Sequence, residues 1–140
     1  MDDLFLFHTT IDVRISDINY GGHVGNDRYL SMFHEARIRY LKALSCSEQD
    51  IGGSVSLIMV TAHVDYKSQA LEGDVLNIAV RIAEISPAKF TMQYRIFNSA
   101  TNKLVSQGYT VLAGYDYSRK RISRLPASFI EKVNGFETKQ

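Results

Sequence analysis

The segment SDINYGGHVGNDRYL, residues 16–30, gathers the side chains of this chain that are best suited to chemistry. It holds two acids, two asparagines, one histidine and three glycines, directly ahead of an apolar helical pattern. His23 supplies an imidazole, the side chain that most often accepts a proton as a general base near neutral pH. The first backbone amides of a helix have no intrahelical partners and favour negative charge. The junction therefore offers a base beside a set of anion-stabilising donors.

A strand before this segment and a helix after it are expected to position these groups. Residues 5–15 alternate between apolar odd positions and mostly polar even positions, which is typical of a half-buried strand. Asn26 or Asp27 is expected to cap the helix with its side chain, and the helix is expected to end near Ser45. Its apolar stripe is broad, which predicts neighbours on more than one side. The stripe comprises Tyr29, Leu30, Met32, Phe33, Ala36, Ile38, Tyr40, Leu41 and Leu44.

The remainder of the chain is predicted to consist of strands. Segments 55–66, 75–85, 90–96 and 105–115 alternate in hydropathy, and the short turns SPAK and NSATNK predict an antiparallel meander. The stretch YSRKRISRLP is basic and is expected to be peripheral. This order predicts an α+β domain in which an antiparallel curved sheet of about five strands wraps around one long central helix. The residues expected to share one face of segment 55–66 are Ile58, Val60, Ala62, Val64 and Tyr66.

The composition is that of one folded domain over residues 1–140, with 45% hydrophobic and 22% charged residues. A formal net charge of +1 gives no broad basic surface for nucleic acid, and no apolar run predicts a signal peptide or a membrane span. Cys46 is the only cysteine, so an internal disulfide is excluded and a cytoplasmic location is expected. The four histidines are scattered rather than spaced as zinc ligands, so we expect no metal and no cofactor.

The order of elements resembles the hotdog fold, and SDINYGGHVGNDRYLSMFHEAR resembles the signature of its 4-hydroxybenzoyl-CoA thioesterase branch. Residues 64–82, VDYKSQALEGDVLNIAVRI, are similar to a family pattern in which an aromatic residue, a short polar link and a Gly-Asp turn precede an apolar strand. The resemblance covers roughly residues 8–118. The residues that match the signature are Asp17, Gly22, His23, Asn26, Tyr29, Glu35, Ala36 and Arg37.

This resemblance implies thioester hydrolysis, which needs a water, a base and donors for the oxyanion. By resemblance, the amides around Asn26 point at the thioester carbonyl and Gly25 lets the acyl group approach closely. Asp27 and Tyr29 complete the expected substrate-binding set. His23 is the first candidate for the base.

One departure from the family pattern concerns the catalytic acid. The second acid of the family's acid-x-acid pair often acts as base or nucleophile, but this chain has Asn19 there. An amide has no useful basicity, although it can orient a water or hold a carbonyl. Glu35 is the second candidate base, because acids on this helix are catalytic in some hotdog thioesterases. Asp17 is the third, as a partner that orients His23.

Each candidate also has a structural interpretation. His23 can hydrogen-bond the turn, and Asp17 can bind nearby backbone amides. Glu35 precedes Arg39 by four residues, the spacing of an ordinary helical ion pair. For the phosphates of coenzyme A, Lys67 is one candidate and the basic tail is another, with a solvated tail as the alternative. The basic residues of the tail are Arg119, Lys120, Arg121 and Arg124.

The expected function is therefore an acyl-CoA thioesterase that uses water to release a free carboxylic acid and coenzyme A, or acts on another acyl thioester. A non-catalytic module that binds acyl ligands is one alternative, favoured by Asn19. A hotdog enoyl-CoA hydratase is another, although its Asp-x-Asn-Pro-x-His motif is matched only over residues 17–19. The exposed sheet edges and incompletely covered helix predict a homodimer or homotetramer.

Overall fold

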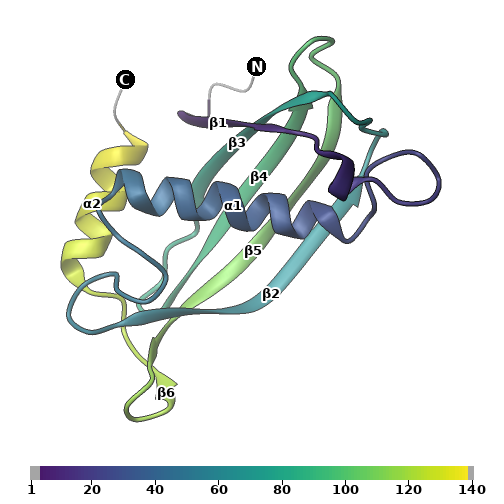
Figure 1. Cartoon of the computed structure of the whole chain (residues 1–140). Helices are drawn as coiled ribbons and strands as arrows, with labels where there is room; N and C mark the ends of the chain where they lie inside the picture. The colour runs from purple at the N-terminus through teal and green to yellow at the C-terminus, as the bar shows by residue number, and fades with distance from the viewer. Residues whose placement is uncertain (1–3, 139–140) are drawn as a thin grey trace.

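The computed structural model describes residues 4–138, whose strands form an antiparallel sheet in the order β1-β3-β4-β5-β2, with β6 paired to the end of β5 (Figure 1). The predicted meander is confirmed as β3–β4–β5. The elements are β1 (Phe7–Asp12), the 3-10 helix η1 (Ile15–Asp17), α1 (Arg28–Ala43), β2 (Ser56–Tyr66), β3 (Val75–Ala83), β4 (Lys89–Asn98), β5 (Leu104–Asp116), β6 (Arg121–Ile122) and α2 (Ala127–Glu137).

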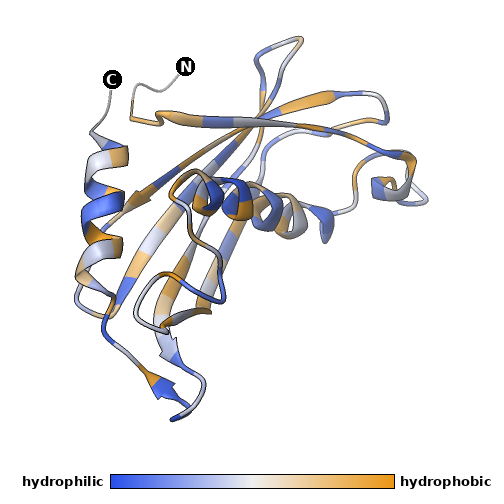
Figure 2. Ribbon diagram, turned by 60° about the vertical axis from the view of Figure 1, so that its left-hand side comes forward, coloured by the Kyte–Doolittle hydropathy of each residue, from blue (hydrophilic) through white to orange (hydrophobic). Residues whose placement is uncertain are grey.

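Helix α1 crosses the concave face of the sheet (Figure 1). Seven of its residues, Tyr29 and Phe33 among them, are buried. Figure 2 shows hydrophobic and hydrophilic positions alternating along the strands that α1 crosses. The ring of Phe33 stacks on Tyr94 of β4 with centroids 4.4 Å apart. At Gly108 of β5, a Cβ atom would lie 2.9 Å from the Phe33 ring and 2.0 Å from the His63 carbonyl oxygen. Only glycine leaves room for β5 between its neighbouring strand and the helix.

The stripe of α1 differs from the sequence prediction at three positions. Leu30 and Ile38 are exposed, whereas the cationic side chain of Arg37 is buried. The guanidinium group donates to Glu48 at 2.7 Å and to the hydroxyl of Tyr94 at 3.0 Å. These bonds offset the cost of removing the charge from water, so a basic residue can occupy a core position.

The predicted face of β2 is wrong over its first half. The strand has a bulge between Met59 and Thr61, and residues 58 and 62 therefore point to opposite faces. Val60, expected to share a face with Ile58 and Val64, is 52% exposed. As β2 ends the sheet at one side, its outer edge is unpaired among the described residues.

The expectation of one long central helix is not confirmed: α1 has 16 residues, and a second helix, α2, packs beside it. Helix α2 buries Phe129 and Val133, one turn apart. Near its end, the Glu137 carboxylate accepts hydrogen bonds from the Tyr40 hydroxyl of α1 and, at 2.9 Å, from the Ile82 amide of β3. This carboxylate fastens α2 to α1 and β3.

Candidate active site

The loop between β1 and α1 is held in place by main-chain bonds. The Asn19 amide donates to the His23 carbonyl at 3.0 Å, and Val24 donates to Ala70 at 2.9 Å. The Asn19 side chain accepts from the Gly21 amide at 2.8 Å. These contacts return the chain to the start of α1 with His23 beside it.

The two amides directly ahead of α1 are unpaired within residues 4–138, and the predicted side-chain cap is wrong. Asp27 occupies the capping position, yet no side chain within residues 4–138 caps the helix. The amides of Asn26 and Asp27 donate no hydrogen bond within that part of the chain. The Gly25 carbonyl accepts from Arg28 at 3.0 Å and so points into the first turn. Because the peptide is planar and trans, the Asn26 N–H points away from that turn.

A cavity of about 260 Å³ lies at this helix start. The Tyr66 hydroxyl, at the end of β2, donates to the Asn26 carbonyl at 3.3 Å. The Tyr66 ring lies edge-on to Tyr29 of α1, with centroids 5.7 Å apart. Burial raises the pKa of Tyr29, which therefore stays a neutral phenol. The lining residues are His23, Val24, Asn26, Tyr29, Tyr66, Lys67, Ser68 and Gln69.

His23 is half-buried at this cavity. Its Nδ1 lies 3.3 Å from the Val24 carbonyl oxygen. A proton on Nδ1 would be donated to that oxygen, which leaves the lone pair of Nε2 free to accept another. A Cβ atom on Gly21 would lie 3.3 Å from Nε2 and 3.2 Å from the Asn19 side-chain oxygen. Glycine at position 21 therefore leaves both atoms accessible.

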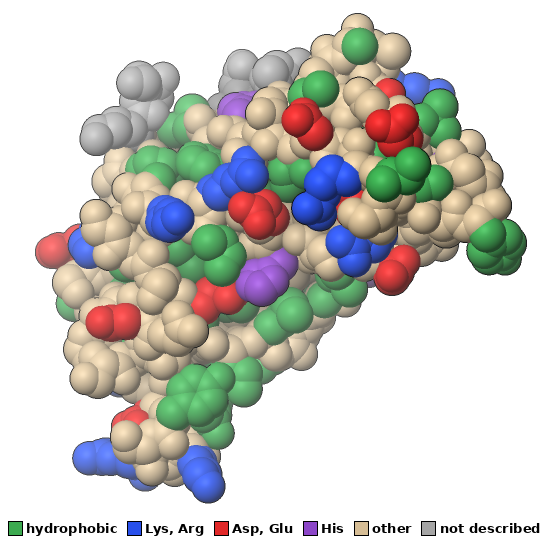
Figure 3. Space-filling view, in the orientation of Figure 1, with side chains coloured by type: hydrophobic (Ala, Val, Ile, Leu, Met, Phe, Trp, Pro, Cys, Tyr) green, Lys and Arg blue, Asp and Glu red, His purple; other side chains and the backbone are tan. Residues whose placement is uncertain are grey.

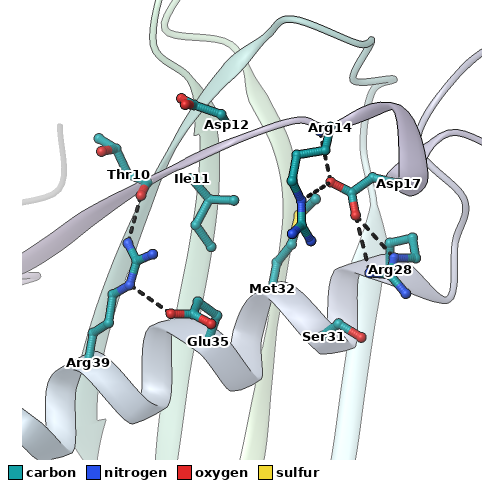
Figure 4. Close-up of a pocket in the computed structure, with 10 residues that line it drawn as sticks. All are labelled: Thr10, Ile11, Asp12, Arg14, Asp17, Arg28, Ser31, Met32, Glu35 and Arg39. Carbon is teal, nitrogen blue, oxygen red and sulfur yellow. Dashed lines mark hydrogen bonds and ion pairs between the residues drawn. The ribbon is translucent and has the colours of Figure 1, made fainter.

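A second cavity, of about 520 Å³, lies on the other side of the helix start, between β1 and α1 (Figure 4). Asp17 is buried here, and its carboxylate pairs with Arg28 at 3.2 Å and with Arg14 at 3.6 Å. Burial alone would raise the pKa of Asp17, but the Arg14 amide and the two guanidinium groups outweigh it and hold the pKa below its ordinary value. The lining residues are Thr10, Ile11, Asp12, Arg14, Asp17, Arg28, Ser31, Met32, Glu35 and Arg39.

The structure therefore separates the candidate catalytic residues. The expected contact of Asp17 with His23 is wrong, because this carboxylate is bound to the two arginines. Glu35 also lines the second cavity, where it pairs with Arg39 at 3.0 Å. Arg39 is further bonded to the Thr10 carbonyl at 2.7 Å, so Glu35 and its partner form a link between α1 and β1.

Gly25 and Asp27 line neither cavity. A Cβ atom on Gly25 would lie 2.7 Å from the Asp27 carboxylate, so this glycine makes room within its own turn. Sequence reasoning did not assign Tyr66, Ser68 or Gln69 to the site. The aromatic and polar link of the segment VDYKSQ was noted, but Tyr66 is 40 residues from Asn26, and only the folded sheet brings them together.

Three further properties concern the part of the chain that the structure describes. Within it, no three His, Cys, Asp or Glu side chains gather as a metal site would require. The helices of the same region include none with the length and apolar character of a membrane span. Burial raises the pKa of the Cys46 thiol, which keeps this cysteine protonated rather than reactive.

Residues 13–133 match the family model of the thioesterase-like superfamily, so the chain belongs to this family. The resemblance to hotdog thioesterases is thereby confirmed. The chain is 24% identical over 129 residues to acyl-CoA thioesterase YbgC of Haemophilus influenzae, covering 91% of this chain and 90% of that protein. It is 29% identical over 100 residues to the 1,4-dihydroxy-2-naphthoyl-CoA hydrolase of Synechocystis, covering 70% and 72% of the two chains.

A solved structure shares the fold over nearly the whole chain. The crystal structure of a thioesterase from Thermus thermophilus, complexed with coenzyme A and Zn, superposes with a TM-score of 0.85 at 25% identity. The match covers 99% of each chain. The six-stranded sheet and α1 are thus those of a hotdog thioesterase.

Proposed function

We propose that this protein is an acyl-CoA thioesterase whose site is the cavity at the start of α1. One observation carries the proposal: Asn26, whose amide is unpaired within residues 4–138, and His23, whose Nε2 is open, line the same cavity. These are the oxyanion donor and the base that thioester hydrolysis requires. The proposal is supported by relatives named for acyl-CoA hydrolysis and by a fold neighbour that contains coenzyme A.

In the proposed reaction, a water oxygen attacks the thioester carbonyl carbon while Nε2 of His23 takes the water proton. The Asn26 amide stabilises the negative charge on the carbonyl oxygen of the tetrahedral intermediate. Collapse of the intermediate breaks the C–S bond, and the imidazolium returns its proton to the departing sulfur. The products are a carboxylic acid and coenzyme A, and the base is restored.

The other candidate residues take supporting roles in this scheme. The Asn19 side chain, whose oxygen lies on the same side of Gly21 as His23, orients the attacking water. Tyr29 forms a wall for the acyl group. Asp17 and Glu35 are assigned to positioning α1 against β1, because their carboxylates are paired away from the His23 cavity.

We also propose that the protein is a homodimer or homotetramer and is cytoplasmic. The unpaired edge of β2 exposes Met59 and Val60, which a second copy can cover. The free thiol of Cys46 suits a reducing compartment. Size-exclusion chromatography with light scattering tests the first statement, and a monomer at micromolar concentration would contradict it.

An acyl-CoA panel with thiol detection tests the function. Aromatic, short-chain and long-chain substrates are each incubated with the protein, and we expect thiol release from at least one class. Absence of thiol release, combined with a rise in Tm on adding acyl-CoA, would identify a binding module instead. Loss of enoyl absorbance from crotonyl-CoA without thiol release would identify a hydratase.

A further inference from the structure

The scheme above accounts for the thioester but leaves the phosphates of coenzyme A unassigned. These phosphates are separated from the sulfur by the pantetheine arm. The arm contains two amide bonds and has about the length of four extended residues, so its reach is about 14 Å. A cation that binds the phosphate nearest to the pantetheine arm must therefore lie within about this reach of the Asn26 amide.

The basic hairpin between β5 and β6 lies too far from the helix start of its own chain. The hairpin lies at the Ser56 end of β2, because Ser56 pairs with Tyr115 and Tyr115 pairs with Ile122 of β6. The start of α1 lies at the opposite end of β2, where Tyr66 bonds Asn26. At about 3.3 Å per residue, Ser56 and Tyr66 are about 33 Å apart along β2, which is more than the reach of the arm. Figure 1 shows β6 and the start of α1 at opposite ends of the molecule, and Figure 3 shows Lys and Arg side chains at the hairpin tip.

The arginines beside the helix start are already committed to acids. Arg28 and Arg14 are bound to Asp17, and Arg39 is bound to Glu35 (Figure 4). They also line the β1 side of α1 rather than the His23 cavity. The single carboxylate of Asp17 is shared by two guanidinium groups and leaves one net positive charge, but that charge lies on the β1 side of α1.

Lys67 differs from these arginines both in its location and in having no acidic partner within residues 4–138. It lines the His23 cavity, and its ammonium group has no hydrogen bond or ion pair with any residue from 4 to 138. Its backbone is nevertheless fixed, because its amide donates to the Val105 carbonyl at 2.9 Å and the neighbouring Ser68 hydroxyl donates to Leu104 at 2.8 Å. An exposed cationic side chain thus projects from a fixed backbone at the cavity.

We propose that Lys67 binds a phosphate of the coenzyme A moiety and makes the enzyme selective for thioesters that carry it. This inference rests on the proposed function. An ammonium group is a compact point charge that binds phosphate oxygens from several directions. The positive end of α1 lies beside the same cavity and adds to the attraction.

The test compares hydrolysis of one acyl group presented as its coenzyme A thioester and as its N-acetylcysteamine thioester, which has no phosphate. In Lys67→Ala, the ratio of kcat/KM for the two substrates is expected to fall about tenfold, through KM of the acyl-CoA. Lys67→Arg is expected to retain most of the ratio. Lys120→Ala, a matched control on the hairpin, is expected to leave it unchanged.

Direct binding of free coenzyme A separates this proposal from the proposed function. By calorimetry, Lys67→Ala is expected to weaken the Kd about tenfold relative to wild type even if neither protein hydrolyses a thioester. Equal losses on both substrates with unchanged coenzyme A affinity would overturn the inference, because Lys67 would then act at the thioester or in folding. A loss confined to Lys120→Ala would assign the phosphates to the hairpin and would also overturn it.

Discussion

The two sides of the α1 start differ in how far their polar groups are already paired. On the side of β2, the Asn26 amide and the Lys67 ammonium have no partner in residues 4–138, and His23 keeps one nitrogen open. On the side of β1, Asp17 and Glu35 are each held by arginine. Unpaired donors can meet a ligand without first losing a protein contact, whereas paired charges mainly hold elements together.

The ion pairs on the β1 side also position the helix start that carries the unpaired groups. Arg28 is the first residue of α1 and Arg14 follows β1, so the Asp17 carboxylate joins the strand to the helix at the point where the open amides begin. Arg39 repeats the connection further along α1, through Thr10 of β1. In the proposed scheme, chemistry and positioning are therefore divided between the two faces of one helix.

The largest expected effect comes from the base. His23→Ala should lower kcat by about 100-fold or more, because a positioned general base is lost, while Tm changes little. Steady-state kinetics on the best acyl-CoA substrate measures this. Glu35→Ala is the matched control and should stay within about twofold of wild type. An equal loss in Glu35→Ala would erase the proposed division between the two faces.

The next effect concerns stability. Asp17→Ala should lower the free energy of unfolding by about 2 kcal/mol, because charged hydrogen bonds to a buried carboxylate disappear. Urea denaturation measures the change. Asp12 lines the same cavity with an exposed side chain, and Asp12→Ala should change the free energy of unfolding by no more than about 0.5 kcal/mol. Similar losses in both variants would mean that the ion pairs at Asp17 have no special role.

Acid should weaken the same connection. The pKa of Asp17 in the folded protein lies below that of the unfolded chain, which is about 3.9. The unfolded state therefore takes up the proton first, so the contribution is complete above about pH 5 and is lost as the pH falls through about 4. The stability difference between wild type and Asp17→Asn should be constant from about pH 6 to 8 and shrink below about pH 4. A constant difference down to about pH 3 would contradict this.

The smallest effect belongs to the exposed ion pair. The side chains of Glu35 and Arg39 are 53% and 39% exposed, so Glu35→Gln should cost only about 0.3–0.5 kcal/mol of unfolding free energy. The difference should vanish in about 1 M salt, where exposed charges are screened. Denaturation at low and high salt measures it. A salt-independent loss would instead point to the packing of this side chain against β1.

Local patterns were enough to predict much of the fold, since the meander and α1 have clear periodicities. The errors at Val60 and Arg37 arise from partners distant in sequence. The bulge depends on pairing with β5, and Arg37 is buried because Tyr94, 57 residues away, accepts its hydrogen bond. Helix α2 is a different case, because Phe129 and Val133 after Pro126 already have helical spacing.

The site was predictable in part for the same reason. His23 and Asn26 lie within one short loop, so their placement beside the helix start follows from the chain itself. Asp17 and Glu35 face β1, whereas the His23 cavity lies at the end of β2. These two strands are at opposite edges of the sheet, so the side of α1 that each residue faces depends on the folded sheet. The sequence therefore could not separate Asp17 and Glu35 from His23, nor bring Tyr66 to the site.

The bond from Glu137 to Tyr40 has a consequence for the order of events during synthesis. The Tyr40 side chain is buried against Phe136 and Phe7, and the acceptor of its hydroxyl, Glu137, lies 97 residues further along the chain. Because a chain is synthesised from its N-terminus, the centre of α1 gains this partner only after residue 137 has been made. A nascent chain halted before residue 137 should remain sensitive to protease at α1, whereas the released protein should resist it.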